Sequence, residues 1–317
     1  MRERATRTVE WDARLSTPGS PVCAPDWLAL REPADAAARS TELAAVVRDE
    51  LCGDDRRGPL TVRDLGCGSG SLGRWLAPRL PGPQTWVLHD RDADLLAIAA
   101  TGLPRVAADG SPVTAFTAPG DLADLDAADL AGASPADRTS LVTASALLDL
   151  LTADEVDALA AACVAAGCPA LLTLSVTGRV RLTPADPLDT AFAAAFDAHQ
   201  RRADGGDSLA PGGGDPLLGP DGGAVAVAAF DRRGATVLTR PSPWQLRSDD
   251  SEDGAAALLE EWLRGWIAAA CVQSPELAEH AAPYLDRRLA TLAAGRLDVT
   301  VGHLDLLALP PSTGDTP

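Results

Sequence analysis

The chain has 317 residues, of which 46% are hydrophobic, so it is long enough for one large domain or two ordinary ones with a substantial core. Its formal net charge of -18 disfavours nucleic acid and anionic membrane surfaces as partners, because the averaged field repels polyanions. The six cysteines lack CxxC spacing and neighbouring histidines, which indicates neither a metal site nor a disulfide framework, and no apolar run approaches the ~18 residues of a membrane span, so we expect a cytoplasmic protein.

Residues 1–55 are expected to form an N-terminal helical cap, because helix-forming residues with helical apolar spacing extend over 26–51. After a polar break, apolar runs typical of strands alternate with helical segments. The expected strands are 60–66, 84–90, 111–122, 139–151 and 169–178. The expected helices between them are 71–80, 91–103 and 152–167, the last with a capping box from Thr152 and Glu155. This alternation predicts right-handed crossovers and a doubly wound, mostly parallel α/β sheet.

The pattern loosens after residue 178. Helices are expected at 186–202, 224–234, 255–271 and 275–295, and strands at 235–244 and 296–310, the last with a bulge at Gly302. The segment 203–223 is rich in glycine, and we expect it to be a flexible insertion that caps a pocket as a lid. Residues 56–310 are therefore expected to form one domain, followed by a disordered tail at 311–317.

A glycine-rich loop, "DLGCGSG" at 64–70, joins the first strand of this domain to the helix that follows it. Glycines at 66, 68 and 70 let the backbone turn tightly and approach a ligand without a Cβ in the way. The helix N-terminus after them suits an anionic or polar ligand group. Because Gly68, Gly70 and Gly73 also have GxGxxG spacing, a dinucleotide site is open as an alternative.

Three aspartates follow or end the first three strands and favour a different nucleotide ligand. Asp64 precedes the first glycine by two residues, where a carboxylate is unfavourable beside a pyrophosphate and favourable beside an ammonium group. Asp90 can accept hydrogen bonds from a ribose diol. Asp121 can accept from an adenine amino group, and the Leu122 backbone can contact the ring edge. The sequence thus predicts a crevice of acceptors around an adenosine that carries an amino acid.

With "DLGCGSG", "WVLHD", "GDL" and "TSLVTASALLDLL", the chain resembles the class I S-adenosylmethionine-dependent methyltransferases over about residues 60–176. The resemblance implies a seven-stranded, mostly parallel sheet with helices on both faces and an antiparallel last strand. It implies S-adenosylmethionine as the cofactor, with Gly66, Gly68 and Gly70 against the methionine moiety. Asp90 would then bind the ribose, Asp121 the adenine, and Ser145 would lie near the sulfonium.

The methyl acceptor is expected to bind at strand ends beyond the fourth strand. Arg179 and Arg202 suit an acceptor with an anionic group, although cations at the end of a helix are also favoured by the helix dipole alone. His199 follows Phe196 on the apolar stripe of its helix and is the candidate general base.

Three further residues have alternative readings. His303 is a weaker candidate base, Asp149 either contacts the acceptor pocket or begins the next helix, and Trp244 is either a pocket wall or a core residue.

Two absences narrow the acceptor class. No D/N-P-P-Y motif follows the fourth strand, and Cys168-Pro169 is not the proline-cysteine order of cytosine methylation, so we expect a small-molecule acceptor. A non-catalytic protein that binds adenosylmethionine or adenosylhomocysteine is the main alternative, and an NAD(P)-dependent oxidoreductase is a further one. The sequence leaves the oligomeric state open.

Overall fold

The computed structural model describes residues 23–52, 59–120, 127–132, 138–202, 215–248 and 254–311. Asp121, Leu122, most of the glycine-rich segment and nearly all of the expected tail lie outside this description. None of the helices described within these ranges is long and apolar enough to cross a membrane.

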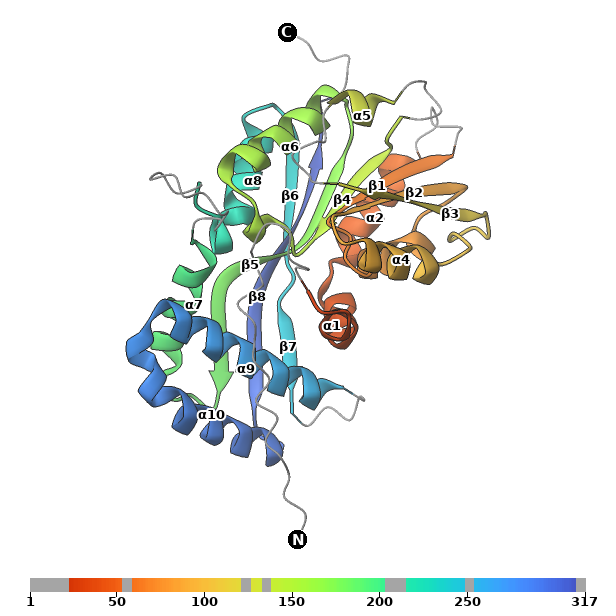
Figure 1. Cartoon of the computed structure of the whole chain (residues 1–317). Coiled ribbons are helices and arrows are strands. Elements are labelled where there is room, and N and C mark those ends of the chain that lie inside the picture. Colours follow the sequence, from red (N-terminus) through yellow and green to blue (C-terminus); the bar gives the residue numbers. More distant parts are fainter. Residues whose placement is uncertain are drawn as a thin grey trace.

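A single eight-stranded sheet forms the centre of the molecule (Figure 1), with the strand order β3-β2-β1-β4-β5-β8-β6 and β7 paired to β8. The strands are β1 (Leu60–Leu65), β2 (Gln84–Asp90), β3 (Val113–Pro119), β4 (Leu141–Ser145), β5 (Ala170–Thr183), β6 (Thr236–Pro241), β7 (Trp244–Arg247) and β8 (Asp298–Leu309). The pairs among β1 to β5 are parallel, whereas β8 is antiparallel to β5, β6 and β7. The expected fold class and the antiparallel last strand are confirmed.

The strand count differs from the expected seven because the strand expected over 235–244 ends at Pro241 as β6, and a further strand, β7, runs from Trp244 to Arg247. Each of the two pairs with a different half of β8. The division lies at Ser242 and Pro243, where proline has no N–H for a strand ladder. The Ser242 N–H donates to the His303 carbonyl at 3.0 Å, and its hydroxyl donates to Asp305 Oδ1 at 2.6 Å.

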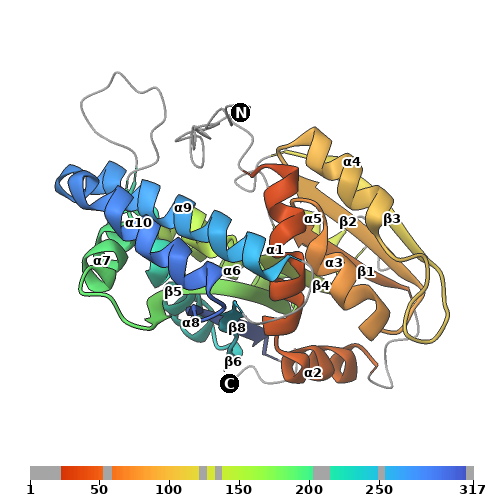
Figure 2. The ribbon, with the colours of Figure 1, turned by 90° about the horizontal axis from the view of Figure 1, so that it is seen from below.

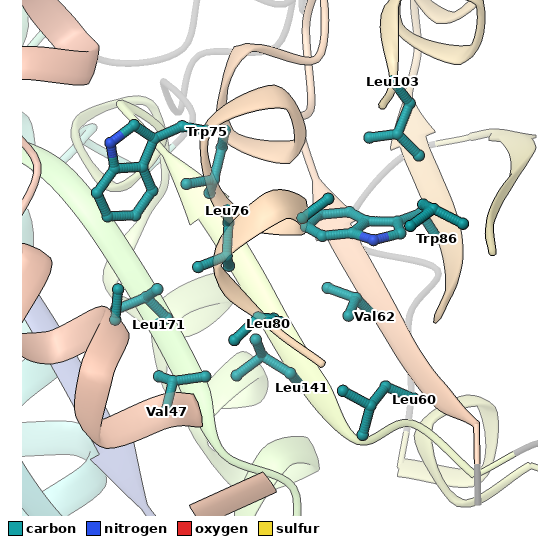
Figure 3. Packing of buried hydrophobic residues seen from close by; sticks show 14 of the residues in the cluster. Val47, Leu60, Val62, Trp75, Leu76, Leu80, Trp86, Leu103, Leu141 and Leu171 are labelled. Carbon is teal, nitrogen blue, oxygen red and sulfur yellow. The ribbon is translucent and has the colours of Figure 1, made fainter. Parts of the chain in front are cut away.

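Helices cover both faces of the sheet. The helices are α1 (Pro25–Ala38), α2 (Thr41–Leu51), α3 (Ser71–Leu76), α4 (Ala93–Gly102), α5 (Ala127–Ala131), α6 (Ala153–Ala165), α7 (Asp189–Gln200), α8 (Gly222–Asp231), α9 (Ala255–Gln273) and α10 (Ala278–Ala293). Apolar residues of α2, α3 and α4 pack on one face, around Trp86 and Leu76 (Figure 3). Those of α6 and α8 pack on the other face, around Phe230. Neighbouring residues of β5 alternate between the two cores, as Leu171 and Leu172 show.

The far halves of β5 and β8 build a second lobe with β7, α7, α9 and α10 (Figures 1 and 2). These two strands have 14 and 12 residues, so they extend beyond the carboxyl edge of the parallel strands. The core of this lobe contains stacked aromatic rings, with the centroids of Phe192 and Tyr284 4.6 Å apart and those of Trp262 and Trp266 5.2 Å apart. The sheet therefore continues from one lobe into the other.

Several expected boundaries move. The helix predicted over 26–51 is two helices, because Ser40 caps α2 by accepting from the Leu43 N–H at 3.2 Å and donates its own N–H to Asp305 Oδ2 at 2.8 Å. The strand predicted over 139–151 ends at Ser145, since Ala146 has a φ of 51° and Leu148–Leu150 form a 3-10 turn.

Two other segments contain more secondary structure than the sequence predicts. The fifth strand continues to Thr183 instead of ending at Gly178. Its pairing with β8 shifts in register between Val176 and Val180, opposite Gly302. A Cβ at Gly302 would lie 2.5 Å from Thr177 Oγ1, so the bulged residues belong to β5 and the glycine makes room for them. The end of the glycine-rich segment also forms regular structure, because Gly219–Asp221 is a 3-10 turn and α8 begins at Gly222.

Candidate functional site

A cavity of about 230 Å³ opens where β1 and β4 lie side by side and their connections leave in opposite directions along the sheet. In open α/β sheets, ligands bind at this reversal of strand order, outside the carboxyl ends of the strands. The wall comes from the loop after β1, the ends of β2 and β4, and α1. Its polar members include Ser69, Ser71, Asp90 and Ser145, so the predicted Ser145 and Asp90 lie on one cavity.

The glycine loop has three left-handed residues with two different roles. Gly66, Gly68 and Gly70 have φ angles of 57°, 53° and 84°. Gly66 and Gly68 line the cavity, and a Cβ at Gly68 would have only Leu28 within 4 Å. Gly70 is not part of the wall. A Cβ there would lie 2.9 Å from Ala99 Cα, so this glycine allows the loop to pack against α4.

Asp90 holds the loop from the end of β2. Its Oδ2 accepts from the Gly68 N–H at 2.8 Å, and its Oδ1 accepts from the Asp92 N–H at 3.0 Å. The carboxylate therefore both lines the cavity and fixes the backbone that faces it. Gly120, at the end of β3, lines the same wall, while the adjoining Asp121 and Leu122 lie beyond the described residues.

Asp64 lies beneath the loop and not on the cavity wall. Its side chain points toward β4, where Thr143 is its direct neighbour in register, and the Thr143 hydroxyl donates to Asp64 Oδ1 at 2.7 Å. Only 1% of the residue is exposed, and Oδ2 has no hydrogen-bond partner among the described residues. Burial raises the pKa of this carboxyl to about 7. The expected contact of Asp64 with the ligand is thus not seen in the described cavity.

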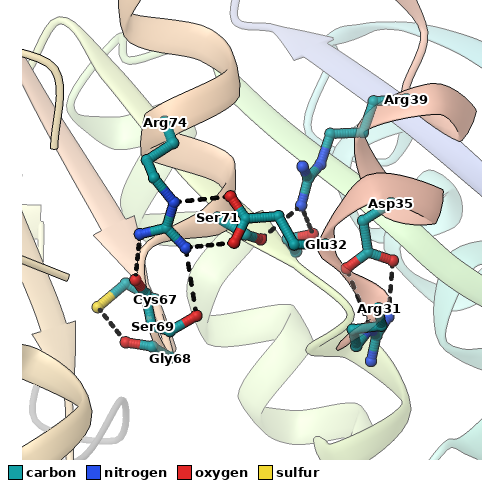
Figure 4. A network of polar contacts seen from close by, with 10 residues as sticks. Arg31, Glu32, Asp35, Arg39, Cys67, Gly68, Ser69, Ser71 and Arg74 are labelled. Carbon is teal, nitrogen blue, oxygen red and sulfur yellow. Dashed lines mark hydrogen bonds and ion pairs between the residues drawn. The ribbon is translucent and has the colours of Figure 1, made fainter. Parts of the chain in front are cut away.

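Arg31 and Asp35 on α1 line the cavity, Arg39 follows directly after this helix, and the sequence reasoning missed all three (Figure 4). Arg31 donates to both carboxylate oxygens of Asp35, at 3.0 and 3.1 Å, and Asp35 also accepts from the Trp244 indole at 3.0 Å. One helical turn further, Arg39 Nη2 donates to Ser71 Oγ at 2.9 Å and to Ser145 Oγ at 3.1 Å. The four-residue spacing of 31, 35 and 39 places all three on one helix face and is the signal that could have found them.

A second ion pair joins α1 to the glycine loop. Arg74 Nε donates to Glu32 Oε1 at 2.6 Å, and Arg74 Nη1 donates to the Ser69 carbonyl at 2.6 Å (Figure 4). Helix α1 is therefore held to the glycine loop through Arg74 and to the second lobe through Trp244, and it forms one side of the cavity.

A second cavity of about 230 Å³, which we call the aromatic chamber, adjoins the first. The two share Cys23, Arg31, Ala146 and Leu150 as wall residues. The aromatic walls of the chamber are Trp27, Phe196, Trp244, Trp262 and Trp266. The polar groups of its wall include the sequence candidates Asp149, His199, Arg202 and His303. Trp244 is thus a pocket wall, and Asp149 faces the chamber from the 3-10 turn after β4.

Arg179 is not brought to either cavity. The sequence places it just after the fifth strand, but that strand continues to Thr183, and Arg179 is an exposed residue within it. Of the two arginines expected to bind an anionic acceptor, only Arg202 lines the chamber. Its Nη1 donates to the His199 carbonyl at 2.6 Å.

Burial changes the protonation of the chamber's ionisable groups. Loss of solvent lowers the pKa values of His199 and His303 to about 4, so both imidazoles are neutral at pH 7, and the Nδ1 atom of each is buried without a partner among the described residues. Burial raises the pKa of Asp149 to about 6. No cluster of three potential metal ligands occurs among the described residues.

No protein-family model matches this sequence, and no curated protein does either. Solved structures do resemble it. The cyclopropane synthase MmaA2 from Mycobacterium tuberculosis has a TM-score of 0.43 and 14% identity over 90% of this chain and 94% of that one. A methyltransferase from Geobacter sulfurreducens in complex with S-adenosyl-L-homocysteine has a TM-score of 0.38 and 16% identity over 91% and 99%.

A third structure, the magnesium protoporphyrin IX methyltransferase from Synechocystis, has a TM-score of 0.36 and 20% identity over 63% of this chain and 76% of that one. The strand order of the sheet itself, with β8 inserted antiparallel between β5 and β6, decides the fold class. The chain has a doubly wound, mostly parallel sheet with an antiparallel last strand, as the resemblance to the class I methyltransferases implies.

The residues around the first cavity fit S-adenosylmethionine. The open space beside Gly68 allows a ligand to approach the backbone, and Asp90 and Gly120 lie at the strand ends expected to meet the nucleoside. Arg39 is 3% exposed, and its Nε and Nη1 have no partner among the described residues, although its two partner serines line the cavity. A buried guanidinium with unused donors suits a carboxylate such as that of a methionine moiety.

Proposed function

We propose that this protein is an S-adenosylmethionine-dependent methyltransferase that acts on a small-molecule acceptor. The observation that carries the proposal is the pair of cavities that meet at a shared wall. One lies at the reversal of strand order behind a glycine loop, where a nucleoside cofactor is expected. The other is small, aromatic and lined by a few polar groups, as sites for small organic molecules are.

The described residues have separate tasks in this proposal. Gly66, Gly68 and Asp90 bind and orient the cofactor, which when bound supplies an activated methyl group. Ala146, at the carboxyl end of β4, lies on the wall common to both cavities and has a strained backbone with a φ of 51°. The aromatic chamber holds the acceptor and excludes water, so that orientation supplies a large part of the rate enhancement.

Two finer assignments belong to the same proposal. His199 is neutral at pH 7 and has an unpartnered Nδ1 on the chamber, which supports its role as a proton acceptor for an acceptor group that arrives protonated. Arg202 also lines the chamber, and an anionic group on the acceptor is the alternative that its guanidinium would favour. Its Nη1 donates to the His199 carbonyl at 2.6 Å.

Titration calorimetry with S-adenosylmethionine, S-adenosylhomocysteine and NAD tests the cofactor. We expect both sulfur ligands to bind and NAD to release no heat, and binding of NAD alone would overturn the proposal in favour of an oxidoreductase. Formation of adenosylhomocysteine in the presence of a metabolite extract then tests catalysis. A protein that binds the cofactor but forms no product with fractions covering amines, acids and alcohols would be the non-catalytic alternative.

A further inference from the structure

The aromatic chamber contains one acidic side chain among the residues that line it in the described structure. Asp149 follows β4 in the 3-10 turn Leu148–Leu150, and that turn packs close to the start of α8, where a Cβ at Gly222 would lie 2.7 Å from the Leu148 carbonyl oxygen. The backbone that carries Asp149 is therefore held in place from behind, and its carboxylate faces the chamber.

The Asp149 carboxylate has unused hydrogen-bonding capacity. Its Oδ2 accepts one long hydrogen bond, 3.4 Å from Gln200 Nε2. Its Oδ1 is buried and has no partner among the described residues. A buried carboxylate oxygen without a donor costs free energy, so this atom is suited to a ligand that brings a donor with it.

The cations on the chamber wall already have partners. Arg31 is bound by both oxygens of Asp35 and lies 4.9 Å from the centroid of the Trp244 ring. Arg202 donates to the His199 carbonyl. Because His199 and His303 are neutral at pH 7, no described histidine on the wall adds positive charge. The charge of Arg31 acts on Asp149, but Asp149 Oδ1 has no hydrogen-bond donor among the described residues, so a ligand can supply one.

Aromatic walls around a carboxylate favour a cation with an apolar body. Ring faces attract ammonium groups, most strongly where water is removed, and tryptophan is the best of the aromatic side chains for this. Four of the chain's seven tryptophans line the chamber. The apolar part of the ligand gains from burial against the same rings.

We infer that the aromatic chamber binds an apolar amine, with the protonated nitrogen held by Asp149 Oδ1 and the apolar body packed between the tryptophans. The inference rests on the proposed function, because it takes the chamber to be the acceptor site, and it adds the chemical class of the acceptor. The ammonium group is the anchor by which the molecule is recognised.

Three probes of similar size test the inference: phenethylamine, 2-phenylethanol and phenylacetate, which are cationic, neutral and anionic at pH 7.5. Binding to the full chain saturated with S-adenosylhomocysteine is followed by tryptophan fluorescence, since four chamber tryptophans report it. We expect phenethylamine to bind at least about tenfold more tightly than either analogue, because a charge-assisted hydrogen bond and the ring faces act on it alone.

Asp149→Asn keeps the shape of the side chain and removes its charge. We expect it to weaken phenethylamine binding by about tenfold and to leave 2-phenylethanol within about twofold. The matched control is Asp154→Asn, an exposed carboxylate at the start of α6 and outside both cavities, which should leave all three affinities unchanged.

Equal or tighter binding of phenylacetate, no binding of any probe, or an amine preference that persists in Asp149→Asn would each overturn the inference. The ranking in the unmodified protein decides the matter even if the variant fails to fold. Titration of S-adenosylhomocysteine without probes keeps the two proposals apart. If that ligand does not bind, the proposed function fails; if it binds and the amine shows no preference, only this inference fails.

Discussion

Asp90 joins the glycine loop to the cavity through hydrogen bonds to two backbone N–H groups. We expect Asp90→Ala to weaken S-adenosylhomocysteine binding by about 1 to 3 kcal/mol, because a ribose hydroxyl pair then loses its charged acceptor. Calorimetry measures the change. Asp94→Ala removes an exposed carboxylate four residues away, outside both cavities, and should bind the ligand normally. Unchanged affinity in Asp90→Ala would remove this residue from the site.

Gly68 and Gly70 should respond differently to the same substitution. In Gly70→Ala the new Cβ would lie 2.9 Å from Ala99 Cα, with a φ of 84°, so clash and backbone strain add, and we expect a loss of stability of about 2 to 4 kcal/mol. In Gly68→Ala the Cβ meets only Leu28 within 4 Å, so the stability loss should be about 1 kcal/mol.

Urea unfolding and calorimetry together separate these two effects. Gly68 faces the cavity, so Gly68→Ala should lower the free energy of S-adenosylhomocysteine binding by more than it lowers the free energy of unfolding. Folded Gly70→Ala should still bind this ligand. The reverse order, with Gly68→Ala the less stable variant, would show that the two glycines have been assigned the wrong roles.

At the scale of single residues, the sequence predicts well which residues lie at the strand ends and predicts poorly which way their side chains point. Gly66, Gly68, Asp90 and Ser145 line the cavity because they follow or end strands, and the ends of parallel strands meet at one edge. Asp64 is one residue inside its strand, where the pairing with Thr143 decides which way its side chain points. That pairing depends on a partner strand far along the chain, which no local pattern reveals.

Helix α6 begins at a capping box that was predicted from the sequence and is confirmed. The Glu155 N–H donates to Thr152 Oγ1 at 3.3 Å, and the Thr152 N–H donates to Glu155 Oε2 at 2.7 Å. We expect Thr152→Ala to lower the free energy of unfolding by about 1 to 2 kcal/mol, since the Glu155 N–H loses its acceptor and the Glu155 carboxylate loses the hydrogen bond from the Thr152 hydroxyl. Urea denaturation measures this change. Thr152→Ser, which keeps the hydroxyl, should recover most of it, and equal losses in both variants would refute the capping explanation.

The element that the sequence interprets least completely is α1. Its helical character is predicted, but as part of one long helix within an N-terminal cap. The break at Ser40 depends on Asp305, which accepts the Ser40 N–H from the last strand. Likewise, the Arg31 and Asp35 pair is fixed as a cavity wall by the Trp244 indole of the second lobe, which donates to Asp35. Tertiary contacts at the two ends of the sequence thus define both the boundary of α1 and its role as a cavity wall.

The whole molecule carries two opposing sets of buried titrating groups. The first set consists of three histidines whose pKa values are lowered to about 4, namely His89, His199 and His303. Between pH 6.5 and pH 4 the unfolded chain binds protons at these imidazoles that the folded chain does not. Their contribution to the free energy of unfolding is therefore lost as the pH falls through this range. The second set consists of Asp64 and Asp149, whose pKa values are raised to about 7 and about 6. The folded chain keeps protons on these carboxyls at pH values where the unfolded chain has lost them. Their contribution to the free energy of unfolding is therefore lost as the pH rises from about 4 toward these raised pKa values.

Asp64→Asn isolates one of these contributions. Asparagine does not ionise, so the free energy of unfolding of the variant relative to the unmodified protein should rise by about 3 to 4 kcal/mol between pH 4 and pH 7 and then level off. The starting difference at pH 4 also contains the changed hydrogen bond to Thr143, so the change with pH, not the absolute difference, is the test. Urea denaturation at each pH gives the difference, and a constant value across this range would contradict the raised pKa of Asp64.

The sequence predicts the central sheet with helices on both faces, but it does not predict the second lobe. Alternating apolar runs and helices predict the doubly wound sheet because parallel strands need crossovers. The extension of β5 beyond residue 178 was not predicted, since Arg179 and Arg181 interrupt its apolar pattern and its bulges break the alternation. The aromatic chamber is lined by residues of α1, α7, α9 and β8 and of the turn after β4, so its walls become neighbours only in the folded molecule.

The position of β8 between β5 and β6 has a consequence for synthesis on the ribosome. β6 and β7 pair with no strand other than β8 among the described residues, and β5 needs β8 for its second edge. Until residue 309 has been made, the nascent sheet therefore has an unfilled gap bordered by apolar strand edges. The central sheet closes only as the last strand is inserted, and the nascent chain must be protected from wrong pairing until then.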